Sequence, residues 1–212
     1  MAQVKTATLE KRDYFFITFI GIAFALFALP ILKNLAIKSI PINATTAIGL
    51  VIFFGLFANI ALFISGLIAK KIPVFLQVAK FAAVGAFNTF LNWGVVNILM
   101  VVTGIYKGFW YSAFIGVAFL AANSGSYFWN KYWTFTDNTE SKKSKEGNFL
   151  QFFGVTLIGF FATLIIATVI TNFVSHPASF TDARWANIGT AIGTLFGLVC
   201  NFIGYKFFVF KK

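Results

Sequence analysis

Long apolar stretches alternate with short polar segments along the whole chain, and each stretch is close to the ~20 residues that a helix needs to cross a bilayer. Six membrane-spanning helices are predicted on this basis, at residues 14–32, 46–69, 79–103, 109–130, 149–173 and 186–207. The composition agrees, because 59% of the residues are hydrophobic and only 11% are charged. The pattern therefore predicts an all-α polytopic membrane protein.

The basic residues are distributed unevenly between the two predicted sides of the membrane. One side, with both termini and the loops at 70–80 and 131–148, holds 13 of the 17 lysines and arginines, and the other side holds 4. By the positive-inside rule, loops rich in lysine and arginine lie on the cytoplasmic side. We therefore expect a multi-pass protein of the plasma membrane with both termini and the 134–148 loop in the cytoplasm. The net charge of +11 favours contacts with anionic lipids and not with nucleic acid.

A ten-residue pattern occurs twice, each time at the end of an apolar stretch. Residues 126–135 read SYFWNKYWTF and residues 201–210 read NFIGYKFFVF, which aligns Lys131 with Lys206. The two copies predict parallel repeats, 79–135 and 149–210, each a hairpin of two helices. We expect residues 71–212 to form a four-span repeat domain and residues 1–70 to be an N-terminal addition of two spans.

Small residues recur every fourth position in the last predicted span. Gly189, Gly193 and Gly197 share one face, and the repeat places Ala118 and Ala122 at the equivalents of the last two. Such a ridge lets two helix backbones approach closely. We therefore expect the 109–130 and 186–207 helices to pack against each other through these residues.

Asparagines lie within the 79–103 stretch, where an unpaired amide is costly. Gly85, Asn88 and Asn92 lie on one helix face, whereas the repeat equivalents of the two asparagines are Leu157 and Phe161. The asparagines either form hydrogen bonds between helices or line a polar groove for a hydroxylated headgroup. Both interpretations stay open from the sequence.

The sequence lacks the residue patterns that several kinds of functional site require. The six acids are all expected in loops or tails: Glu10, Asp13, Asp137, Glu140, Glu146 and Asp182. The lone His176 is expected in a polar loop, the lone Cys200 excludes a disulfide framework, and no phosphate-binding glycine loop is present. We expect no metal site, no cofactor and no enzymatic activity.

The repeat domain resembles the GtrA family of small membrane proteins, which includes the membrane portion of some dolichol-phosphate-mannose synthases. Residues 80–89, KFAAVGAFNT, are similar to the family's opening helix, and residues 126–135 and 201–210 resemble its Asn-x-x-x-Asn-Arg-x-Trp-Thr-Phe ending. The chain departs from this pattern with Ser126 in place of asparagine. Lysine stands at 80, 131 and 206, where arginine is common.

The resemblance implies a flippase that moves a polyprenyl-phosphate-linked monosaccharide, such as undecaprenyl-phosphate-glucose, in the synthesis of cell-surface polysaccharide or glycolipid. Amides and interfacial lysines then contact the headgroup, and neighbouring aromatic rings stack on the sugar. The headgroup-binding candidates are Lys80, Asn88, Asn92, Asn130, Lys131, Asn201 and Lys206.

Two other interpretations remain at this stage. Lysines and aromatic residues are also common wherever a helix meets the membrane–water interface. These residues can therefore form an ordinary interfacial girdle without binding a headgroup. The chain can instead be a non-catalytic membrane subunit that anchors a glycosyltransferase through the basic 134–148 loop. A homo-oligomer is a further possible assembly.

Overall fold

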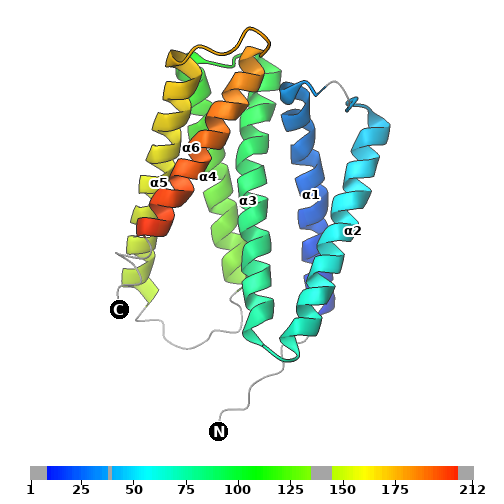
Figure 1. Cartoon of the computed structure of the whole chain (residues 1–212). Helices are drawn as coiled ribbons and strands as arrows, with labels where there is room; N and C mark the ends of the chain where they lie inside the picture. Colours follow the sequence, from blue (N-terminus) through cyan, green and yellow to red (C-terminus); the bar gives the residue numbers. More distant parts are fainter. Residues whose placement is uncertain (1–8, 38–39, 135–144, 205–212) are drawn as a thin grey trace. The chain divides into compact units, whose positions relative to one another are not determined.

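The structure, a computed structural model, describes residues 9–37, 40–134 and 145–204. In these ranges the chain is helical, without strands, and Figure 1 shows the order of the helices. They are α1 (Lys11–Leu35), α2 (Ala44–Ala69), α3 (Val74–Thr103), α4 (Gly108–Trp129), the π-helical turn η1 (Asn130–Thr134), α5 (Lys145–Phe173) and α6 (Asp182–Gly204). The predicted all-α class is confirmed.

Each of the six long helices coincides with a predicted span, with shifts at the ends. α1, α2, α3 and the Phe153–Phe173 part of α5 are long and apolar enough to cross a membrane. The protein is therefore a polytopic membrane protein, and the spanning role of α4 and α6 stays a prediction. α1 starts at Lys11 and α3 at Val74, both earlier than predicted. The first turn of α1 is polar and remains helical because Asp13 finds partners, whereas the added residues of α3, 74–78, are largely apolar.

The chain divides into two compact units that cut across the helices. The first unit is Met1–Lys33, Ile37–Gly94 and Leu120–Asp137, and the second is Asn34–Ala36, Val95–Phe119 and Asn138–Lys212. α2 and almost all of α1 therefore pack with the beginning of α3 and the end of α4. The bounds of these two packed units therefore differ from the predicted sequence division into 1–70 and 71–212.

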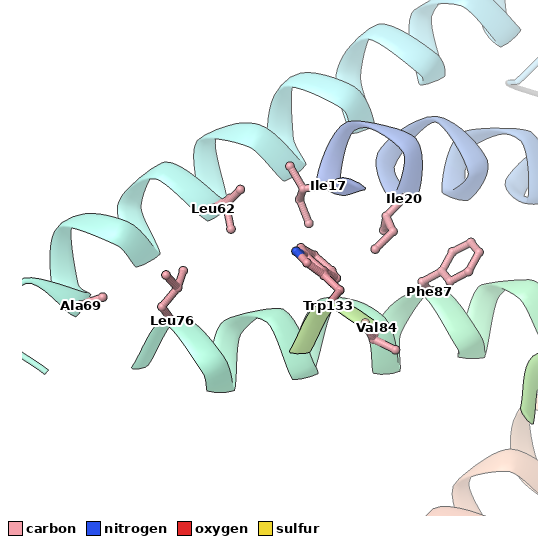
Figure 2. Close-up of a cluster of buried hydrophobic side chains, with 8 residues drawn as sticks. All are labelled: Ile17, Ile20, Leu62, Ala69, Leu76, Val84, Phe87 and Trp133. Carbon is pink, nitrogen blue, oxygen red and sulfur yellow. The ribbon is translucent and has the colours of Figure 1, made fainter. Parts of the chain in front are cut away.

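The first unit has a core that joins the N-terminal helices to α3 and η1. Figure 2 shows its buried side chains, which are Ile17, Ile20, Leu62, Ala69, Leu76, Val84, Phe87 and Trp133. Gly21 brings α1 and α2 together, because a Cβ there would lie 2.6 Å from the carbonyl oxygen of Phe54. The Asn59 amide also donates to the Thr18 hydroxyl at 2.8 Å. The N-terminal helices thus share one core with the beginning of α3.

The second unit is held by an apolar core with polar contacts inside it. Its buried cluster is Val96, Met100, Tyr111, Phe114, Ile115, Ala118, Ala167 and Ala186. The Tyr111 hydroxyl on α4 lies 3.0 Å from the Ala186 carbonyl oxygen and 2.8 Å from the Thr190 hydroxyl on α6. A buried amide chain runs from Asn34 to Asn97 and on to Asn187. These buried polar groups are paired, as a water-free interior favours.

The glycine ridge of α6 packs on α5, so the prediction that it faces the 109–130 helix is wrong. A Cβ at Gly193 would lie 2.6 Å from the Thr163 carbonyl oxygen, and Gly189 and Gly197 likewise press against Thr171 and Thr163. Ala118 and Ala122 are buried, and the Tyr111 hydroxyl joins α4 to α6. The ridge lies between α5 and α6 because a short connection joins these two helices, and consecutive helices with a short connection usually pack side by side.

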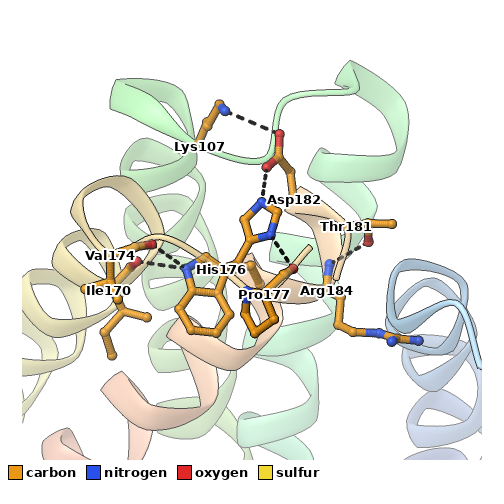
Figure 3. A network of polar contacts seen from close by, with 9 residues as sticks. Lys107, Ile170, Val174, His176, Pro177, Thr181, Asp182 and Arg184 are labelled. Carbon is orange, nitrogen blue, oxygen red and sulfur yellow. Dashed lines mark hydrogen bonds and ion pairs between the residues drawn. The ribbon is translucent and has the colours of Figure 1, made fainter. Parts of the chain in front are cut away.

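A polar network closes the connection between α5 and α6 in the second unit (Figure 3). The Asp182 carboxylate lies 3.0 Å from His176 Nε2 and 3.4 Å from Lys107 Nζ. His176 Nδ1 lies 3.0 Å from the Pro177 carbonyl oxygen, so this nitrogen is the donor. These contacts raise the pKa of His176, first through the Pro177 carbonyl and then through Asp182. The predicted loop position of His176 is confirmed.

Candidate functional site

A buried ion pair lies at the start of α3, in the first unit. Lys80 Nζ is 2.6 Å from Asp13 Oδ1, and the exposed fractions of the two side chains are 13% and 1%. The expectation that every acid lies in a loop or tail is wrong for Asp13, Glu146 and Asp182, which all lie at the starts of helices. Asp13 is in the first turn of α1, and its own helix and two distant donors hold it inside.

Asp13 accepts three hydrogen bonds from three different parts of the chain. Its Oδ1 accepts from Lys80 Nζ and, at 2.8 Å, from the indole nitrogen of Trp133. Its Oδ2 accepts from the backbone N–H of Glu10 at 3.0 Å, which caps the first turn of α1. A buried carboxylate is stable only with such partners, and removing one partner of a buried pair typically costs about 3–5 kcal/mol.

The π-helical turn η1 carries Trp133 into the interior. It follows α4 directly and consists of Asn130–Thr134, the centre of the first repeated pattern. Trp133 is only 1% exposed, while its neighbour Tyr132 is 55% exposed. Short π-helical segments are rare and frequently mark functional sites. Here the wide turn ends the α4 helix and places one indole N–H against Asp13.

Aromatic rings cluster beside the ion pair, around Trp133. Trp129 and Trp133 pack edge to face at 6.0 Å, and the Phe16 ring meets both, at 5.4 and 5.8 Å. Phe87 contacts Trp129 at 6.0 Å, and Lys80 Nζ lies 5.8 Å from the Trp133 ring centre. In such surroundings a charged hydrogen bond is stronger than in water.

Two of the predicted asparagines present buried carbonyl oxygens in the same unit. Asn88 Oδ1 and Asn130 Oδ1 are both buried, and neither has a hydrogen-bond donor within the part of the chain that the structure describes. Gly125 lies beside Asn88, whose Oδ1 would be 3.9 Å from a Cβ at that position. Asn130 donates from its amide nitrogen to the Ser126 hydroxyl at 3.3 Å. These oxygens can accept hydrogen bonds from a ligand or from water.

The other predicted headgroup residues are placed less completely. Asn92 lies one helical turn beyond Asn88 on α3 and is half-buried. Lys131 has its backbone in η1, but its side chain is outside the described part, and Lys206 lies outside the described residues altogether. Asn201 belongs to the second unit, where it packs on Gly159 and has a buried oxygen without a donor among the described residues.

Sequence reasoning did not include Asp13 in the site. One signal was available, because an acid in the first turn before a long apolar stretch is typical of a capped helix start. That signal predicts a helix beginning at Lys11, but it does not predict a partner. The contacts to Lys80 and Trp133 depend on how α1 is rotated against α3 and η1.

A family model described as the GtrA/DPMS transmembrane domain matches residues 80–210. The matched region includes Lys80, Asn88, Asn130 and Trp133, whereas Asp13 precedes it. No curated protein and no solved structure matches the chain. Since the family model covers well over half of the 212 residues, the chain belongs to the GtrA/DPMS transmembrane domain family.

Proposed function

We propose that this protein is a flippase for a polyprenyl-phosphate-linked monosaccharide such as undecaprenyl-phosphate-glucose, acting in the synthesis of cell-surface polysaccharide or glycolipid. Membership of the GtrA/DPMS transmembrane domain family supports the proposal. The observation that carries it is the composition of the site in the first unit. The matched region supplies donors, on Lys80 and Trp133, and buried carbonyl acceptors without donors among the described residues, on Asn88 and Asn130.

These groups fit the chemistry of a phosphate-linked sugar. A phosphate oxygen accepts hydrogen bonds, and each bond from a charged donor such as Lys80 contributes about 1.5–3 kcal/mol. A sugar hydroxyl donates to a carbonyl oxygen and would pair Asn88 or Asn130, whose unpaired burial otherwise costs about 1–3 kcal/mol each. The polyprenyl tail would lie in the bilayer against exposed apolar side chains of α3 such as Val78 and Phe81.

The charge distribution supports a direction of entry. Lys80 lies near the start of α3 and Lys131 in η1, on the side that holds 13 of the 17 basic residues. The positive-inside rule assigns that side to the cytoplasm, where polyprenyl phosphosugars would enter. Lys206, the repeat equivalent of Lys131, would add a second interfacial cation.

Leaflet-resolved transport tests this function. Liposomes that contain only this protein and labelled undecaprenyl-phosphate-glucose should show movement of the label between leaflets. Lys80→Gln should slow it roughly ten- to a hundredfold, since one charge-assisted hydrogen bond is lost. The matched control is Lys71→Gln, an exposed lysine between α2 and α3. Transport no faster than in protein-free liposomes would contradict the proposal.

The family description favours a second candidate, since it names the transmembrane domain of DPMS beside GtrA. In this case the chain is a membrane subunit that anchors a glycosyltransferase and moves no lipid. Deleting the protein should then release the glycosyltransferase from the membrane fraction. Reintroducing the Lys80→Gln variant should restore its attachment, whereas a flippase defect would persist.

A further inference from the structure

The acceptor and the donors of the buried ion pair come from different parts of the sequence. Lys80 and Trp133 belong to the region that matches the family model, residues 80–210. Asp13 lies in α1, before that region. Without Asp13, the Lys80 ammonium group and the Trp133 indole N–H would have no acceptor among the contacts found within residues 9–37, 40–134 and 145–204. The matched region therefore supplies two donors, and the N-terminal helix supplies the anion that they contact.

We infer that Asp13 is a built-in anion that occupies the phosphate position of the headgroup site and is exchanged for the phosphate of the lipid-linked sugar. This inference rests on the proposed function, since it assigns the regulation of the same site. One carboxylate oxygen accepts from both Lys80 and Trp133, at 2.6 and 2.8 Å. A phosphate oxygen can accept the same two hydrogen bonds.

The burial of the two charges is compatible with exchange. Asp13 is 1% exposed, but the Lys80 side chain keeps 13% of its surface accessible, so a headgroup can reach the cation first. The third hydrogen bond of Asp13 comes from the Glu10 N–H, which lies at the start of the same helix, α1. This bond would therefore be kept if the first turn of α1 moved. Displacing the first turn of α1 thus removes the carboxylate and leaves both donors in place.

A purely structural role explains the charges less well. Two helices can be joined by apolar side chains at equal or lower free energy than by a buried ion pair. An exchangeable carboxylate has a different advantage, because Lys80 would keep a counter-ion before binding, during binding and after release. The bound phosphosugar would then be released without leaving a buried cation unpaired.

Lipid binding in nanodiscs tests the exchange. The probes are undecaprenyl phosphate and undecaprenyl-phosphate-glucose, and the variants are Asp13→Asn, Lys80→Gln and Asp182→Asn. Asp13→Asn keeps the shape of the side chain and removes the competing charge, so it should bind both lipids about tenfold more tightly than the parent. Lys80→Gln should lose at least about tenfold. Asp182→Asn removes one negative charge from an exposed side chain of the second unit, is the matched control and should bind like the parent.

The outcomes separate this inference from the proposed function. If Asp13→Asn binds no more tightly than the parent while Lys80→Gln loses binding, the exchange is wrong and the headgroup site stands. If the parent and every variant fail to bind either lipid, the proposed function fails and the inference fails with it.

A second measurement uses the unchanged chain, in case Asp13→Asn does not fold. The indole N–H signals of the five tryptophans can be followed by ¹⁵N NMR, with Trp133 assigned by replacing the other four in turn. Saturating undecaprenyl phosphate should shift the Trp133 signal, because its acceptor changes from carboxylate to phosphate. The signal of Trp110, an exposed residue at the start of α4, should stay in place. Bound lipid with an unshifted Trp133 signal would overturn the exchange.

Discussion

Asp13 and Asp182 both lie beside basic side chains, but they differ in how deeply they are buried. Asp13 is buried beside Lys80 and Trp133, whereas Asp182 is 42% exposed beside His176 and Lys107. Water and salt screen the second group, so its pairs contribute little to stability. The first pair is shielded, and breaking it should be strongly destabilising or should demand a replacement anion. Burial, and not residue type, separates a candidate site from a surface contact.

The contact between His176 and Asp182 predicts a small pH dependence of stability. The pKa of His176 is raised above 6.5 by the Pro177 carbonyl and by Asp182. A raised pKa stabilises the folded protein fully below the unfolded value of 6.5, and this contribution is lost as the pH rises through the folded value. The melting temperature should therefore fall slightly from about pH 6 to pH 8.

His176→Gln should remove this slope, as measured by thermal unfolding in detergent at pH 6, 7 and 8. Asp182→Asn is the companion variant and should flatten the curve only in part, because it removes the negative charge that favours protonated His176 but leaves the Pro177 carbonyl in place. An unchanged slope in both variants would show that another group titrates in this range.

At the scale of helices, close backbone approach defines the α5–α6 hairpin. Gly189, Gly193 and Gly197 on α6 meet Ala167, Thr163 and Gly159 on α5, so small residues lie on both sides. With no hydrophobic drive between helices in lipid, such contact is a main source of association. Gly21 does the same for α1 and α2, although a single glycine there produced no repeat in the sequence.

Gly193→Leu should destabilise the second unit. Even a Cβ at this position would lie 2.6 Å from the Thr163 carbonyl oxygen, which is part of the helix backbone and cannot rotate away. Overpacking of this kind typically costs about 1–3 kcal/mol. Thermal unfolding should show a lower midpoint. The control is Gly116→Leu in α4, where nothing lies within 4 Å of the added Cβ. Equal midpoints for the two variants would refute a tight α5–α6 contact.

At the scale of the molecule, the distribution of charge predicts the topology. The termini and the 134–148 loop carry most of the basic residues and should be cytoplasmic. In a Cys200→Ser background, a thiol introduced as Ser141→Cys should react with an impermeant reagent only after the cells are opened. Ser179→Cys, at an exposed position between α5 and α6, should react in intact cells. The reverse labelling pattern would invert the proposed direction of transport.

The sequence by itself determined the helices and the family. Apolar stretches of membrane length reveal themselves locally, so all six predicted spans coincide with helices. The repeated ending and the 80–89 stretch are also local patterns, and the family match over 80–210 confirms the resemblance they indicated. Helix ends were predicted less well, since α1 begins at Lys11 in a polar turn that hydropathy excludes, and α3 begins at Val74, before the predicted start at residue 79.

Only the tertiary structure decided which faces meet. Periodicity showed that Gly193 lies on a small-residue face, but its partner, α5, depends on how α6 is rotated in the second unit. Likewise, Asp13 and Trp133 are 120 residues apart, and no local pattern connects them. Their contact with Lys80 exists because the core of the first unit sets the rotation of α1 against α3, while the π-helical turn directs Trp133 inward. In a membrane, where nearly every helix face is apolar, hydropathy cannot choose between such rotations, and side-chain packing and buried hydrogen bonds do.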